Sequence, residues 1–262
     1  MNDTIFKRIH TILQLSSVGA AGIAMVLQTV AFLFNMSENS NYYEIGAAFP
    51  IAATALAILA AIIGTFDAFF SARQVSDKQK ERSLATIPCG CGFIIAGVFT
   101  TGIGTIGMIL LVLSAIYCLL SSFTPAQYKF LSAGLGLVTI PAFIYLTGCL
   151  YFDNTIEMNA PAKLLLQIAF LSSMLFFTGE LRYQMGIPAP RVYRMVCAWT
   201  IASGAVASLP VILAYLFGTI TRTDYLTGAI LLLGVTATAI IRLFSYENKT
   251  PLEATNDADT TI

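Results

Sequence analysis

The feature that most constrains this chain is a series of apolar blocks, each about as long as a membrane is thick. A helix rises about 1.5 Å per residue, so roughly 20 apolar residues cross the ~30 Å hydrocarbon core of a bilayer. Blocks of this kind cover residues 12–34, 45–70, 128–151, 161–179, 195–217 and 225–244. Backbone groups in lipid must pair within their own segment, so we expect each block to be a helix.

Composition indicates the same environment. The chain is 57% hydrophobic and 11% charged, whereas soluble domains carry about 25% charged residues. Its formal net charge is zero, so no global field attracts nucleic acid. We therefore expect an all-α polytopic transmembrane helix bundle over residues 1–246, with the lipid bilayer as its main partner. Residues 247–262 are polar and acidic and predict a disordered tail.

The number of crossings depends on residues 85–121, which are long for one span and short for two. With one crossing there are seven spans, and eight Lys and Arg residues lie inside against six outside. With two crossings, turning between Gly102 and Gly107, twelve lie inside and only Lys163 and Arg222 outside. Basic residues of short loops stay in the cytoplasm, so we predict eight spans, both termini cytoplasmic. Seven spans or a re-entrant hairpin are the alternatives.

Ionisable side chains near membrane depth are the default functional candidates, because inserting one costs roughly 2.5–3.5 kcal/mol. Asp67 lies near the cytoplasmic end of the second span. It is either a cation or proton site facing the bundle, or an interfacial carboxylate paired with Arg73 or with the basic cluster of residues 78–82. Glu180 and Arg182 close the sixth span two residues apart, so they lie on different helix faces. We expect each to find a partner on another helix or in water.

Two further polar residues complete the candidates. Lys163 shares a helix face with Gln167 near the outer end of its span, and we expect it to extend to the interface. Gln28 in the first span is of a kind that more often hydrogen-bonds helices together than binds substrate. The candidate ligand-binding set is therefore Asp67, Glu180, Arg182, Gln28 and Lys163.

Motifs for metal binding and catalysis are weak. Cys89-Gly90-Cys91 lacks the spacing of a zinc knuckle and has no second Cys or His pair. His10 is the only histidine, so a Ser–His or Cys–His catalytic pair is not expected. The sequence contains no Gly-x-Ser-x-Gly, His-Glu-x-x-His or phosphate-loop pattern. We expect no metal, no cofactor and no catalytic residue.

The stretch from Asn159 to Arg194 carries a family resemblance. It contains Asn159-Ala160-Pro161-Ala162-Lys163, Met174-Leu175-Phe176-Phe177, Glu180-Leu181-Arg182-Tyr183 and Gly186-Ile187-Pro188-Ala189-Pro190-Arg191-Val192-Tyr193. It resembles an uncharacterised family of bacterial eight-span polytopic membrane proteins with no assigned activity. The resemblance implies a bacterial cytoplasmic-membrane protein and implies no reaction. The residues to which it points are Lys163, Glu180, Arg182 and Arg191.

Three functions remain open. Short loops leave mainly the bundle interior to work with, which favours permeation or transport of a small molecule or ion, although no charge lies near mid-membrane. The second is a scaffold or regulatory subunit whose basic cytoplasmic loops contact anionic lipid or a protein partner, and the third is a lipid-acting enzyme. Transport predicts a polar cavity lined by Asp67, Gln28 or Glu180, whereas a scaffold predicts that these groups pair with one another.

Overall fold

The computed structural model describes residues 3–36, 42–44, 46–70, 85–99, 104–123, 129–155, 157, 159–185 and 189–245. Within these ranges the chain is helical, with one isolated β-bridge between Met36 and Tyr43. The helices are α1 (Asp3–Phe34), α2 (Ala48–Phe70), α3 (Ile87–Phe99), α4 (Gly104–Phe123), α5 (Lys129–Gly136), α6 (Thr139–Phe152), α7 (Pro161–Gln184), α8 (Pro190–Ala207), α9 (Leu209–Leu216) and α10 (Thr223–Ser245). The predicted all-α fold is confirmed. The predicted tail, residues 247–262, lies outside the described residues.

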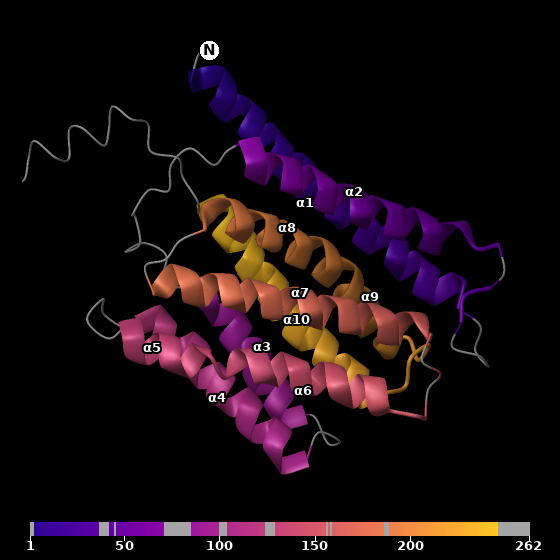
Figure 1. Ribbon diagram of the computed structural model, residues 1–262. Helices are drawn as coiled ribbons and strands as arrows, with labels where there is room; N and C mark the ends of the chain where they lie inside the picture. The colour runs from indigo at the N-terminus through magenta and orange to yellow at the C-terminus, as the bar shows by residue number, and fades with distance from the viewer. Residues whose placement is uncertain are drawn as a thin grey trace, which may run out of the picture.

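The helices form a bundle with α10 near its centre (Figure 1). The pair α1 and α2 lies along one edge and packs on α8. On the other side, α3 and α4 form a second pair, α6 packs on α4, and α7 packs on α6. Helix α10 contacts α3, α7, α8 and α9, so it joins the two sides.

Seven helical segments of the described chain are long and apolar enough to cross a membrane. They are Arg8–Phe34, Ala48–Phe70, Gly104–Phe123, Ser132–Phe152, Pro161–Gln184, Pro190–Leu216 and Thr223–Phe244. Their outward faces carry large apolar side chains, such as Ile51 and Phe70, which are 71% and 64% exposed. An apolar surface of this extent fits lipid as the solvent, and the chain is a multi-pass membrane protein in its architecture.

Two predicted helices are interrupted near prolines. The block predicted at residues 128–151 consists of α5 and α6, with a turn at Leu137 and Val138. The block predicted at residues 195–217 begins earlier, at Pro190, and is broken at Ser208 between α8 and α9. Pro141 and Pro210 lack the N–H that would bond to the carbonyl four residues earlier, so each break lies in the turn before a proline.

The ambiguous segment, residues 85–121, forms two helices that run antiparallel. A Cβ built on Gly90 would lie 3.0 Å from the Leu119 side chain, and one on Gly97 would lie 3.7 Å from Leu111. Helix α4 begins at Gly104 with a φ of +67°, which glycine adopts without steric cost. Helix α3 has 13 residues, so it rises about 20 Å and is shorter than the hydrocarbon core.

Helices α3 and α10 approach through glycines. A Cβ on Gly92 would lie 3.2 Å from the Cα of Leu231. A Cβ on Gly234 would lie 2.5 Å from the carbonyl oxygen of Pro88. Small residues at such crossings let helix backbones pack directly where lipid removes the hydrophobic drive for association.

Gly234→Ala therefore forces α3 and α10 apart. We expect a loss of about 1–3 kcal/mol in unfolding free energy, as for other overpacked interiors, measured by thermal unfolding in detergent. Gly22→Ala is the matched control, because a Cβ there meets no atom within 4 Å, and it should be neutral or slightly stabilising. Equal melting temperatures for the two variants would show that the α3–α10 contact is not tight.

Candidate functional site

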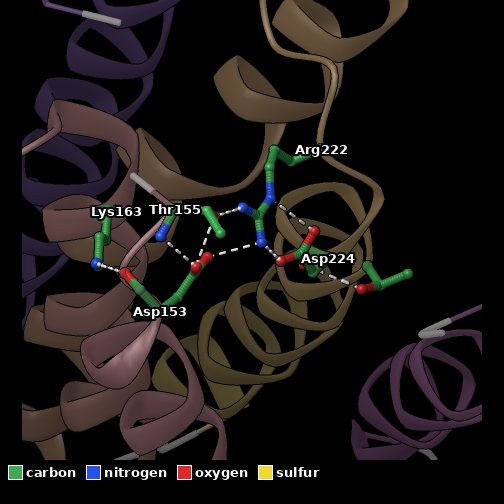
Figure 2. A network of polar contacts seen from close by, with 6 residues as sticks. Asp153, Thr155, Lys163, Arg222 and Asp224 are labelled. Carbon is green, nitrogen blue, oxygen red and sulfur yellow. Dashed lines mark hydrogen bonds and ion pairs between the residues drawn. The ribbon is translucent and has the colours of Figure 1, made fainter. Parts of the chain in front are cut away.

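A network of charged side chains lies at one end of the bundle, where α6 ends and α10 begins (Figure 2). The Arg222 Nη2 atom lies 2.7 Å from Asp153 Oδ2 and 2.5 Å from Asp224 Oδ2. Arg222 Nε also donates to Asp224 Oδ1 at 3.2 Å, and Nη1 donates to the hydroxyl of Thr155. One guanidinium thus joins the loop after α6 to the start of α10.

Lys163 adds α7 to this network. Its side chain is 1% exposed, and Nζ donates to the carbonyl oxygen of Asp153 at 2.7 Å. We expected Lys163 to extend to the interface, but it turns inward to the end of α6. Thr155 donates from its backbone N–H and its hydroxyl to Asp153 Oδ1, at 2.9 and 2.6 Å.

Asp153 and Arg222 each favour the charged form of the other. Partial burial works to raise the pKa of Asp153, but hydrogen bonds from Thr155 and the charges of Arg222 and Lys163 outweigh it and leave the pKa below its ordinary value. The hydrogen bonds from Arg222 to Asp224 raise the pKa of Arg222, against the opposing effect of burial. Both groups are therefore charged at neutral pH.

A cavity of about 270 Å³ lies next to the network. At about 30 Å³ per water molecule, this volume corresponds to roughly nine waters. Helices α3, α6, α7 and α10 all contribute to its wall. Its charged lining comes from Asp153, Arg222 and Asp224, Thr227 adds a hydroxyl, and its apolar lining includes Leu146, Phe170 and Leu231. The cavity is therefore amphipathic, with charge at the end of the bundle and hydrocarbon toward the interior.

A layer of aromatic rings borders the cavity. The ring of Phe170, which lines the cavity, lies 6.0 Å from that of Phe143. Phe143 in turn lies 5.6 Å from Phe93 and 5.7 Å from Phe177. All four rings are at most 2% exposed, so they close the bundle between the cavity and its other end.

A second charged cluster lies near the opposite end of α7. Glu180, which is 2% exposed, lies 2.8 Å from Arg242 Nε and accepts from Arg242 Nη2 at 3.1 Å. The hydroxyl of Tyr193 also donates to Glu180. Glu180 thus has partners on α8 and α10, whereas Arg182 is exposed.

Asp67 pairs with the only histidine of the chain. His10 Nδ1 contacts Asp67 Oδ1 across the α1–α2 interface, and Asp67 is 1% exposed. Arg73 and residues 78–82, the partners that the sequence predicts, lie outside the described residues. The sequence did not point to His10 as the partner of Asp67, because the two residues are 57 positions apart. The available signal was that the first two spans are antiparallel neighbours, which brings such distant positions together.

The candidate residues do not converge on one site. Gln28 donates to the hydroxyl of Tyr43, Asp67 pairs with His10, and Glu180 pairs with Arg242. None of these three lines the cavity of about 270 Å³, and Lys163 alone of the set belongs to the network beside it. The sequence did not identify the cavity's charged residues as candidates, because they lie in loops and at a helix start, outside the apolar blocks. Among the described residues, no group of three His, Cys, Asp or Glu is placed to hold a metal ion.

Comparison of the chain with protein-family models, curated proteins and solved structures gives no match in any of the three. The resemblance to bacterial eight-span membrane proteins therefore remains an expectation. Fold and cavity together define the class as a multi-pass helical membrane protein with an amphipathic cavity at one end of the bundle.

Breaking the buried pair of Glu180 and Arg242 should be costly. Glu180→Gln leaves a guanidinium without its carboxylate, so we expect a loss of about 3 kcal/mol or more. In the double variant with Arg242→Gln, the loss should be smaller than the sum of the single losses. Arg182→Gln is the control and should change stability by less than about 0.5 kcal/mol, because Arg182 is exposed. Additive losses in thermal unfolding would contradict the pairing.

The lowered pKa of Asp153 predicts acid sensitivity. A carboxyl whose folded pKa is depressed contributes stability that is complete above its unfolded pKa of about 3.9 and lost as pH falls through the folded value. The difference in melting temperature between the wild type and Asp153→Asn should be constant from about pH 5 to 7 and shrink below about pH 4. A difference that does not change with pH would rule out an ionised, stabilising Asp153.

Proposed function

We propose that the chain crosses the cytoplasmic membrane eight times, with both termini in the cytoplasm. The support is that α3 lies antiparallel to α4. Of these two helices, only α4 is long enough by itself to cross a membrane. Thr86, just before α3, hydrogen-bonds to Ser122 near the end of α4 at 2.6 Å. The segment before α3 and the end of α4 therefore lie at one level, and the chain covers the same depth twice.

The distribution of bases supports this topology. Lys163 and Arg222, the two bases that it places outside, both contact Asp153 or Thr155. Arg242, which it places inside, pairs with Glu180 near the other end of α7. The 17 positions from Lys163 to Glu180 correspond to about 25 Å along a helix, most of a hydrocarbon core.

We propose that the protein binds a small amphipathic molecule in the cavity of about 270 Å³ from the outer side and carries it across the membrane. The observation that carries the proposal is the cavity's division into a charged end and an apolar interior. A ligand's polar end would contact Asp153, Arg222 and Asp224, and its apolar part would lie against Leu146, Phe170 and Leu231. Such few, convergent polar groups in an apolar pocket are typical of small-molecule sites.

The residues below the cavity fit an outward-open carrier. Phe143 and Phe177 close the bundle next to the cavity floor. Beyond them, the ion pair of Glu180 and Arg242 joins α7 to α10 near the cytoplasmic end in the proposed topology. Passage to the inside requires these two barriers to open, as alternating access demands of a carrier with one accessible side.

A scaffold is the second candidate, and one observation favours it. Asp67, Gln28 and Glu180 do not pair with one another, as the scaffold prediction had it, but each has a side-chain partner elsewhere in the bundle, so none of them is left for a ligand. A scaffold needs no accessible cavity, so access to the cavity distinguishes the two functions.

Cys149 gives a native probe, because it is a free cysteine that lines the cavity. In a variant with the other cysteines replaced by alanine, we expect a membrane-impermeant thiol reagent to label Cys149 from outside intact cells. Cys149→Ala in the same background is the control and should not be labelled. Hexylamine, hexanoate and norleucine are the probes for protection, and at least one should slow labelling in proportion to its occupancy.

Transport is then measured with the protecting probe in radiolabelled form, as uptake into proteoliposomes. Uptake above that of protein-free liposomes supports a carrier. Protection without uptake would leave a binding protein, and a Cys149 that no reagent reaches from outside would favour the scaffold. Labelling of Cys149 from the inside only would overturn the proposed topology.

A further inference from the structure

A second cavity, of about 190 Å³, lies on another side of Arg222. Its lining includes Met36, Thr155, Ile220, Thr221, Arg222 and Tyr225. The polar side chains of this lining are one guanidinium and three hydroxyls, and no carboxylate belongs to it. The first cavity, by contrast, is lined by both Asp153 and Asp224. Arg222 therefore separates a cavity lined by carboxylates from one whose lining contains none.

Tyr225 is the second observation that points to a ligand. Its side chain is 3% exposed, and its hydroxyl is buried without a hydrogen-bond partner among the described residues. The guanidinium of Arg222 lies 5.7 Å from the centre of its ring. Leaving a buried hydroxyl unpaired costs free energy because its hydration is lost without replacement. Tyr225 lines the second cavity, so a group bound there would supply the missing partner.

Arg222 retains capacity to bind such a group. A guanidinium has five N–H donors in a planar fork. The hydrogen bonds to Asp224 and Thr155 use the Nε–H, one Nη2–H and one Nη1–H, and the ion pair with Asp153 places Nη2 2.7 Å from its Oδ2. One Nη1–H remains, and the Arg222 side chain is 30% exposed. Arg222 thus offers a charge and a donor, and Tyr225 offers a hydroxyl.

We propose that the second cavity binds a small anionic group between Arg222 and Tyr225. Its chemistry is that of a chloride ion or of a phosphate or carboxylate oxyanion, because positive charge and hydroxyl donors favour negative charge. The source is either a free ion or the phosphate of a lipid headgroup, since the site lies at the end of the bundle. The inference stands apart from the proposed transport function, because it rests on the second cavity alone.

Bound anion would also act on the first cavity. Arg222 is shared between Asp153 and Asp224. An anion that draws the guanidinium toward Tyr225 weakens its hold on both carboxylates. The acidic lining of the first cavity would then be more available to a positively charged ligand. This coupling between the two cavities rests on the proposed function, whereas anion binding in the second cavity does not.

The test uses the full chain purified in a neutral maltoside detergent, with HEPES as the only other anion. Thermal unfolding is followed while chloride, inorganic phosphate or acetate is titrated. A parallel series adds phosphatidylglycerol or a glycolipid without phosphate. We expect a saturable rise in melting temperature with at least one anionic probe. A response to free ions assigns a soluble anion, and a response to phosphatidylglycerol alone assigns a lipid phosphate.

Tyr225→Phe is the decisive variant, because it removes only the unpaired hydroxyl. Without anion, its melting temperature should equal or exceed that of the wild type. With anion, its apparent Kd should be at least tenfold weaker. Tyr215→Phe in α9 is the matched control and should respond as the wild type does.

Three results would overturn the proposal: no rise with any anionic probe, an unchanged Kd in Tyr225→Phe, or a lower melting temperature of this variant in the absence of anion. The last result would mean that the hydroxyl already has a partner within the protein. Failure of the carrier experiments would leave these outcomes unaffected, because anion binding is measured without transport.

Discussion

Direct contact between helix backbones is the constraint on which this structure depends. Lipid is as apolar as the helix surfaces, so packing must hold the bundle together. Gly64 of α2 lies against Ala198 of α8, and Gly204 of α8 lies against Thr236 of α10. Gly234 then brings α10 against the first turn of α3. These close crossings place α10 at the centre, and the position of α10 in turn fixes where Arg222 and Arg242 stand.

The two ends of α10 therefore carry different chemistry. At one end, Arg222 is shared by two carboxylates beside cavities, and part of its side chain is exposed. At the other, Arg242 pairs with the buried Glu180. Aromatic rings fill the level between them. The bundle therefore differs between its two ends, with a cavity lined by charged residues at one end and a buried ion pair at the other.

Much of the fold follows from the sequence, because hydropathy alone determines which segments must be helical in lipid. The division of residues 85–121 into two helices was also predictable from glycines, although α4 already begins at Gly104, inside the turn predicted between Gly102 and Gly107, and residues 100–103 lie outside the described residues. The site was not. Charge at membrane depth pointed to Asp67 and Glu180, which pair in the bundle with His10 and Arg242. Asp153 and Arg222 looked like ordinary loop charges, and only the folded chain brings these positions, 69 apart, within 2.7 Å.

The shortness of α3 has a consequence for the surrounding membrane. Helix α3 has 13 residues, about 10 Å less than a typical hydrocarbon core requires, and its outward face carries Val98 and Phe99, which are 71% and 63% exposed. Acyl chains that touch this face must shorten or bend, at a cost of fractions of a kcal/mol per ångström of mismatch. In the proposed eight-span topology, α3 would thin the bilayer on this flank, so the protein would gather in thin membrane regions and draw toward itself other proteins that deform the bilayer in the same way.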